Sequence, residues 1–275
     1  MEIQKSTEPA KYLEFERKGW GTLIDKYDET FGAVTRQSVE VTLDACGVRR
    51  DSRVLDVCCG PGMLSAAAVA RGAHAIGLDF PGVVSLAEKL VPGAQFQSGD
   101  ATNLPFDENH FDAVVCGYGI MHVPDAERAL QEMLRVLKPG GRLALTVWDS
   151  ESIGGLGVLF KAIMDHANMN VPMPHGPSIF QFSTFAKMNE LLSAAGFANV
   201  QNKRHAQNWR LPSGTHFLRA AREGTVRTGV ILAAQTDQAI ATILTAFEDA
   251  LSSCRTADGL FDIPMPAIVG SGSKA

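Results

Sequence analysis

The stretch Arg53-Val-Leu-Asp-Val-Cys-Cys-Gly-Pro-Gly62 decides the fold of this chain. Its first half is apolar and rich in β-formers without strict alternation, which predicts a short strand covered on both faces. Gly60 and Gly62 predict a tight turn in which the backbone can approach a ligand closely. Residues 63–70 are small and predict a helix whose N-terminal amides point to the same place. Together they indicate a small-molecule site at the carboxyl end of a parallel sheet.

The charge of Asp56 indicates which kind of small molecule binds there. A dinucleotide-binding loop follows the pattern G-x-G-x-x-G, and counting from Gly60 its third glycine would fall at Ser65. Asp56 lies inside the strand just before the turn, where a carboxylate opposes a pyrophosphate but suits a cationic amino group. S-adenosylmethionine carries an ammonium and a sulfonium and no phosphate. We therefore expect this cofactor rather than a nicotinamide cofactor.

Composition and length limit the class of protein. The 275 residues, 45% of them hydrophobic, can bury a full core, and the net charge of −5 gives no general electrostatic footprint for nucleic acid or an anionic membrane. The chain starts without an apolar signal core, and no apolar run approaches the ~18 residues needed to span a bilayer, so we expect a cytoplasmic protein. The five cysteines form no C-x-x-C pair, and no metal is predicted.

Strand and helix patterns alternate after the glycine turn. Residues 73–79, 94–98, 111–118 and 142–148 predict strands, and residues 83–90 and 125–137 predict helices. This alternation predicts an α/β fold with a doubly wound, mostly parallel sheet. Asp79 ends the second strand, where an acid accepts hydrogen bonds from ribose hydroxyls. Asp100 follows the third strand and is expected to bond the adenine amino group.

Both ends of the chain are expected to add to this core within a single domain. Residues 1–47 look helical and amphipathic and predict either a cover on the domain edge or a lid over the cofactor, with Trp20 and Tyr27 as candidate ligand contacts. Residues 50–150 form the expected cofactor-binding core. Residues 151–275 predict substrate-side additions and closing strands: helices at 153–170, 183–195, 215–223 and 236–254, a proline-rich loop at 171–177, and strands at 199–209 and 260–269.

Five motifs occur in order: VLDVCCGPG, GLDF, GDATNLPF, FDAVVCGYGIMHVPD and RVLKPGGRLALTVW. In sequence and spacing they resemble the class I S-adenosylmethionine-dependent methyltransferases, and look most like the small-molecule branch that includes the ubiquinone- and menaquinone-biosynthesis methyltransferases. The resemblance covers about residues 50–150 and implies a Rossmann-like sheet of seven strands, closed by an antiparallel hairpin. It also implies the residues of a cofactor site. The methionine moiety would be held by Asp56, Cys59, Gly60 and Gly62, and the ribose by Asp79. The adenine would be met by Phe80, Asp100 and Ala101, and the floor of the site would be formed by Gly117 and Tyr118.

Methyl transfer from a sulfonium is an in-line displacement, so the enzyme mainly has to orient the acceptor, which can supply up to roughly 7–11 kcal/mol. A base is needed only where the acceptor must lose a proton. His122 follows the fourth strand and is the candidate catalytic residue; alternatively it caps the following helix region or contacts the cofactor without titrating. His175, on the proline-rich loop, is a second candidate base.

Four functions remain open, and we favour a methyltransferase that acts on a small, apolar or aromatic molecule. Residues expected around that acceptor are Trp20, Met121, Trp148, Met173 and Phe180, with core packing as the alternative for the same side chains. The same fold and cofactor also serve other reactions, such as a cyclisation. The acidic balance argues against a methyltransferase for RNA, with a protein substrate as the related possibility. The fourth alternative is a regulatory protein that binds S-adenosylmethionine without turnover. The acceptor and the oligomeric state are left open.

Overall fold

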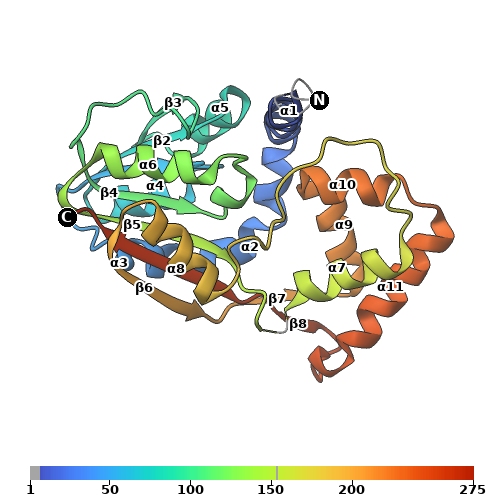
Figure 1. Ribbon diagram of the computed structural model, residues 1–275. Coiled ribbons are helices and arrows are strands. Elements are labelled where there is room, and N and C mark those ends of the chain that lie inside the picture. The colour runs from blue at the N-terminus through green and yellow to red at the C-terminus, as the bar shows by residue number, and fades with distance from the viewer. Residues whose placement is uncertain (1–6, 153) are drawn as a thin grey trace.

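The computed structural model describes residues 7–152 and 154–275. Figure 1 shows a sheet flanked by helices, with a second group of helices to one side. The main sheet has seven strands in the order β3-β2-β1-β4-β5-β9-β6. β1 to β5 run parallel, whereas β9 is antiparallel to both β5 and β6. This confirms the predicted α/β fold with a mostly parallel, seven-stranded sheet. The strands are β1 (Arg53–Val57), β2 (His74–Asp79), β3 (Gln95–Ser98), β4 (Phe111–Gly117), β5 (Leu137–Trp148), β6 (Ala198–His205) and β9 (Ala267–Ser273).

Helices cover both faces of this sheet, which is why its central strands are apolar on both sides. α3 (Val39–Ala45) and α4 (Met63–Ala70) pack against each other and the sheet, and α5 (Pro81–Leu90) packs on β2 and β3. α6 (Ala126–Val136) packs on β5 and α8 (Phe185–Ala194) on β6 and β9. In β1, Val54 joins the core cluster that contains Leu43 of α3, whereas Leu55 joins the cluster that contains Leu130 of α6. Neighbouring residues of one strand thus serve two cores.

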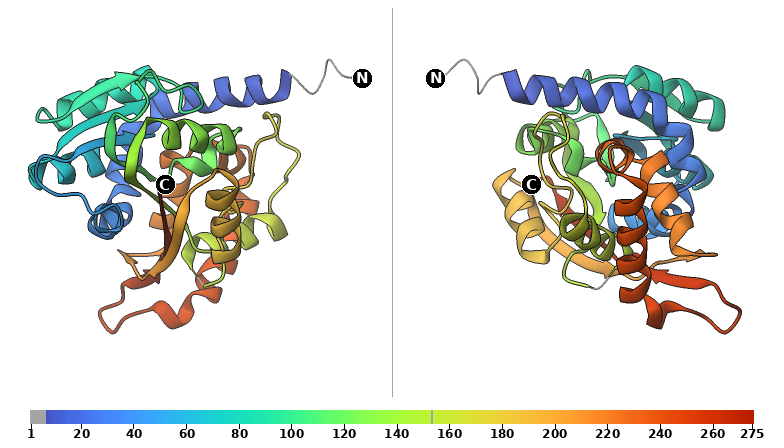
Figure 2. Two further views of the ribbon diagram at one scale, coloured as in Figure 1. Left: turned by 60° about the vertical axis from the view of Figure 1, so that its left-hand side comes forward. Right: turned by 90° about the vertical axis from the view of Figure 1, so that its right-hand side faces the viewer.

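The N-terminal helix α1 (Thr7–Glu29) lies along one edge of the molecule, as Figure 2 shows, and packs against α5, α9 (Gly214–Gly224) and α10 (Val226–Ala233). Two glycines allow this close approach. A β-carbon on Gly19 would lie 2.5 Å from a methyl carbon of Val226, and one on Gly82 would lie 2.9 Å from the backbone of Gly21. The chain reaches α3 through α2 (Gly32–Thr35) and a short 3-10 helix. The first six residues of the expected helical cover lie outside the described residues.

The C-terminal third differs from the predicted pattern at three places. The predicted strand 199–209 is two strands, because the chain leaves β6 at His205 and resumes as β7 (Asn208–Leu211). The predicted strand 260–269 is also two: β8 (Phe261–Pro264) pairs with β7 in a separate two-stranded sheet, and β9 enters the main sheet. Pro264 and Pro266 flank that break, since proline cannot donate to a strand ladder. Finally, α10 was not predicted.

The remaining helices form the group at one side of Figure 1. α7 (Gly155–His166) packs against α11 (Asp237–Ala250), and α9 packs against both α10 and α11. α7 is shorter than the predicted helix 153–170, whose first residue, Ile153, lies outside the described residues. Of the helices in the described ranges, none combines the length and the apolar character that crossing a membrane requires.

Candidate functional site

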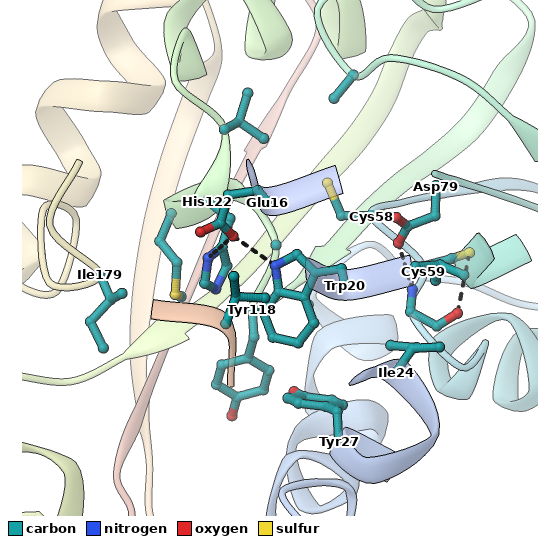
Figure 3. Close-up of a pocket in the computed structure, with 18 of the residues that line it drawn as sticks. Glu16, Trp20, Ile24, Tyr27, Cys58, Cys59, Asp79, Tyr118, His122 and Ile179 are labelled. Carbon is teal, nitrogen blue, oxygen red and sulfur yellow. Dashed lines mark hydrogen bonds and ion pairs between the residues drawn. The ribbon is translucent and has the colours of Figure 1, made fainter. Parts of the chain in front are cut away.

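A cavity of about 360 Å³ opens where β1, β2, β4 and β5 end, and α1, α7, α9 and α10 complete its wall. Figure 3 shows part of its lining. The strand ends meet here because parallel strands present their carboxyl ends at one edge of a sheet, which is where open α/β sheets bind ligands. The volume falls in the range of about 300–1,000 Å³ that is usual for small-molecule sites.

The turn after β1 is held in an unusual backbone conformation. Cys58, Gly60 and Gly62 have φ angles of +57°, +54° and +84°. Asp56 ties this turn to α4, because its Oδ2 accepts hydrogen bonds from the amide (3.0 Å) and the hydroxyl (2.7 Å) of Ser65. Its Oδ1 is buried and finds no hydrogen-bond partner in the described ranges. A buried carboxyl oxygen at a cavity wall can accept a hydrogen bond from a donor group of a bound ligand.

Asp79, at the end of β2, braces the same turn from the other side. Its Oδ2 accepts the amide of Gly60 at 2.9 Å, and its Oδ1 accepts the amide of Phe80 at 2.7 Å. Burial raises the pKa of Asp79 to about 6, although both amides act in the opposite direction. Burial likewise raises the pKa of Asp56 to about 7, against the hydrogen bonds from Ser65. Each oxygen of Asp79 keeps a lone pair for a ligand hydroxyl.

The structure brings the residues predicted from the sequence together around this cavity, with one exception. Gly62 lines a separate hollow with Met63 and Leu90. Its φ angle and the ring of Phe96, 3.0 Å from where a β-carbon would lie, account for a glycine there without a ligand. The predicted residues that do line the cavity are Trp20, Tyr27, Asp56, Cys59, Gly60, Asp79, Phe80, Asp100, Ala101, Gly117, Tyr118 and His122.

The expected acceptor region is placed less completely. Trp20, Met121 and Trp148 line the cavity, whereas Met173, Phe180 and the exposed His175 are not part of its lining. Ile179, which follows the proline-rich loop, and Phe160 of α7 line the cavity instead. Residues 171–177 of the proline-rich loop are therefore absent from the lining, and Ile179, two residues after the loop, is the apolar contact from this segment.

Sequence reasoning missed Glu16 of α1, which is 1% exposed and lines the cavity. Its Oε2 accepts the indole N–H of Trp20 at 2.7 Å and lies 3.2 Å from Nδ1 of His122 (Figure 3). Burial raises the pKa of Glu16, but the interactions with His122, Trp20 and Tyr12 outweigh it and leave the pKa below its ordinary value. Since the attraction to His122 acts only when the imidazole is protonated, the ionised form of Glu16 is favoured as part of this pair. Its one signal in the sequence is the i, i+4 spacing to Trp20.

Aromatic rings form the wall next to Glu16. The rings of Trp20 and His122 form a T-shaped pair, with centroids 5.2 Å apart and planes at 82°. Trp20 also meets Tyr27 at 5.6 Å, and Tyr118 packs on Trp148 at 4.4 Å. Burial raises the pKa of Tyr27 to about 12, so its hydroxyl stays protonated. The remaining contacts on this side are apolar and include Leu13, Ile24, Val123, Leu156 and Leu159.

The cavity thus has two chemically different ends. One is built from strand-end loops and carries Asp56 and Asp79; the other is apolar and aromatic and carries the pair Glu16–His122. Within residues 7–152 and 154–275, no three His, Cys, Asp or Glu side chains are grouped to hold a metal ion.

Comparison with known proteins identifies relatives. A family model described as "Methyltransferase domain" matches residues 55–145. The demethylmenaquinone methyltransferase of Clavibacter sepedonicus is 33% identical over 165 residues, which cover 55% of this chain and 67% of the relative. The demethylmenaquinone methyltransferase of Listeria monocytogenes serotype 4a is 31% identical over 200 residues, which cover 64% of this chain and 81% of the relative. The crystal structure of the YcgJ protein from Bacillus subtilis superimposes with a TM-score of 0.58 at 23% identity, covering 86% of this chain and 97% of that one, and shares the fold.

Proposed function

The chain belongs to the class I S-adenosylmethionine-dependent methyltransferases, and from that premise we propose that it methylates a small apolar or aromatic molecule by in-line displacement. S-adenosylmethionine is the methyl donor of this family. The observation that carries the proposal is the division of the cavity into an acidic end and an apolar, aromatic end. Such a division suits a cationic donor at one end and an uncharged ring at the other.

The acidic end fits the donor. Asp56 Oδ1, which lacks a partner in the part of the chain that the structure describes, would accept a hydrogen bond from the donor's ammonium group. Asp79 would accept from the ribose hydroxyls with the lone pairs that its two amide contacts leave free. Phe80, Asp100 and Ala101 would meet the adenine, and Cys59, Gly60, Gly117 and Tyr118 the rest of the molecule. The bound donor supplies an activated methyl group, so the protein's task is to orient the acceptor and exclude water.

The apolar end favours an acceptor with a flat, hydrophobic ring system. Trp20, Tyr27, Trp148 and Phe160 supply aromatic surface there. Relatives of this chain are named demethylmenaquinone methyltransferases, so hydroxylated naphthalenes and benzenes are the first acceptors to test. α1 would act as a lid, because its side chains line the end where the acceptor would bind.

Calorimetric titration with S-adenosylmethionine and S-adenosylhomocysteine tests the donor site. We expect micromolar binding to the wild type, a large loss in Asp79→Ala, and no loss in Asp107→Ala, which removes an exposed carboxylate outside the cavity lining. Absence of binding in a folded sample would refute the proposal.

An acceptor screen with isotopically labelled methyl donor then tests the reaction. Label in an aromatic product supports methyl transfer to a small molecule. Conversion of a substrate without incorporation of label would replace methyl transfer by another reaction at the same site.

A further inference from the structure

We infer that Glu16 is a positioning residue that holds His122 as general base for an acceptor with a phenolic or enolic hydroxyl. This inference rests on the proposed function and deepens it, because it names the chemical class of the acceptor. It also gives α1 a second role: the helix would bring a functional group to the site as well as cover it.

The burial of Glu16 is the first observation. An ionised carboxylate that is 1% exposed is costly unless a cation or several donors compensate it. Among the ion pairs in the described ranges, Glu16 is joined to no lysine or arginine, and its partner is His122. Its Oε1 has no hydrogen-bond partner there either. The fold thus buries a carboxyl group beside one imidazole, so that the negative charge of Glu16 and a proton on His122 stabilise each other.

The orientation of the imidazole is the second observation. Nδ1 lies 3.2 Å from Glu16 Oε2, and the indole of Trp20 packs against the imidazole in a T-shaped arrangement. Trp20 is itself fixed by its hydrogen bond to the same oxygen. A carboxylate at Nδ1 favours the tautomer with the proton on Nδ1, which leaves the lone pair on Nε2. His122 lines the cavity, so this lone pair is available to an acceptor there.

The contact between Nδ1 and Oε2 is within ion-pair distance but does not meet hydrogen-bond geometry. Contacts of this kind are often poorly aligned in the absence of substrate and tighten when it binds. A small rotation of the imidazole would complete the hydrogen bond without moving Glu16.

The proton transfer balances as follows. The hydroxyl proton of the acceptor goes to Nε2 of His122, and the electron pair it leaves on oxygen forms the new O–C bond. The C–S bond of the donor breaks, and its electron pair stays on sulfur. His122 becomes an imidazolium, whose charge the carboxylate of Glu16 stabilises.

A purely structural role would have Glu16 merely anchor Trp20 in the lid. Glu16→Gln separates the two roles, because the amide oxygen can still accept the indole N–H but carries no charge. The matched control is Glu14→Gln, which removes an exposed carboxylate of the same helix that pairs with Arg17.

The first readout needs no acceptor. ¹⁵N spectra of the neutral His122 imidazole should show the Nδ1–H tautomer in the wild type with S-adenosylhomocysteine bound. Glu16→Ala should lose this preference, whereas Glu14→Gln should keep it. An Nε2–H tautomer in the wild type would overturn the inference.

The second readout uses an acceptor from the screen. A general base contributes about 10²–10⁴-fold, so His122→Gln should lower kcat by about 100-fold or more. Glu16→Gln should lower kcat at least tenfold with little change in KM, and Glu14→Gln should behave as the wild type. Equal kcat in the two glutamine variants of α1, or a methyl group found on carbon or nitrogen, would overturn the inference. Failure of the wild type to methylate any acceptor would instead refute the proposed function, while the tautomer still reports on the Glu16–His122 pair.

Discussion

Replacing Asp56 with asparagine should make the ligand-free protein more stable at pH 8 and less able to bind its donor. The asparagine side chain has the same shape, and its oxygen can accept both hydrogen bonds that Ser65 now donates to Oδ2. What changes is the charge. Asp56 is 1% exposed, and its Oδ1 has no hydrogen-bond partner within the described residues.

The magnitude follows from the pKa of this carboxyl. Burial raises the pKa of Asp56 from 3.8 to about 7, and one pH unit is worth about 1.36 kcal/mol, so the folded chain disfavours the ionised form by about 4 kcal/mol relative to the unfolded chain. The pKa of Asp56 is higher in the folded chain than in the unfolded chain. The protein therefore keeps its full stability below about pH 4, where Asp56 is protonated in both states, and loses this contribution as the pH rises through 7. At pH 5 less than half of this stability has been lost, and by pH 8 all of it has been lost.

Urea unfolding without ligand at pH 5 and pH 8 measures this difference. The stability advantage of Asp56→Asn over the wild type should grow by about 2–3 kcal/mol between the two pH values, with unchanged m-values. The exposed Asp107→Asn should show no such pH dependence. An advantage of equal size at both pH values would refute the reasoning, because it would locate the effect in packing rather than in the charge. Calorimetry at pH 8 should show at least tenfold weaker binding of S-adenosylmethionine to Asp56→Asn.

Three further outcomes are expected. Affinity for S-adenosylmethionine should fall as the pH drops below about 6, because the raised pKa values of Asp79 and Asp56 mean that both carboxylates become protonated there. Calorimetry at pH 5.5 and 8 measures this affinity, and equal values at the two pH values would contradict the prediction. Gly62→Ala should lower stability by about 1–3 kcal/mol, since it combines a φ of +84° with a contact to Phe96, yet leave donor affinity unchanged. Gly60→Ala, at a φ of +54°, should also lower stability but in addition weaken donor binding, so similar affinities in the two variants would contradict this assignment. Gly19→Ala should push α1 away from Val226 and lower turnover, whereas Gly157→Ala, with no described atom within 4 Å of its added methyl, should only strengthen its helix. Thermal unfolding and acceptor kinetics compare the two variants. Equal turnover would argue against a lid role for α1.

The core of the fold could be predicted because its signals are local. Val54 and Leu55 are both apolar because each faces a different layer of helices, and that absence of alternation is visible in the sequence. The convergence of Asp56, Asp79 and Gly117 then follows from topology, since parallel strands end at one edge. No contact between distant residues had to be known.

The rest depends on contacts that the sequence does not encode locally. Glu16 lies on an amphipathic helix, where a glutamate ordinarily faces water, and its partner His122 is far along the chain. α10 follows α9 after the single extended residue Thr225, without a proline to mark the break. Gly62 has two sufficient explanations, a close ligand or a left-handed backbone, and only the position of Phe96 separates them.

The unpartnered oxygen of Asp56 explains why stability and function should oppose each other at this residue. Buried side-chain oxygens and nitrogens are normally hydrogen-bonded. In the described part of the chain, Asp56 Oδ1, Glu16 Oε1 and His122 Nδ1 are buried without a hydrogen-bond partner, and all three residues line the same cavity. Four further atoms of this kind in the described ranges, Tyr12 Oη, Ser183 Oγ, Asn202 Oδ1 and Gln207 Oε1, lie outside the cavity lining, and Nδ1 of His122 already faces Glu16. Asp56 Oδ1 is therefore the atom whose partner would arrive with the donor. Because the pKa of Asp56 is raised whereas that of Glu16 is lowered, neutralising Asp56 should stabilise the free protein and neutralising Glu16 should not. An Asp56→Asn variant that gained in both stability and donor affinity would contradict this account.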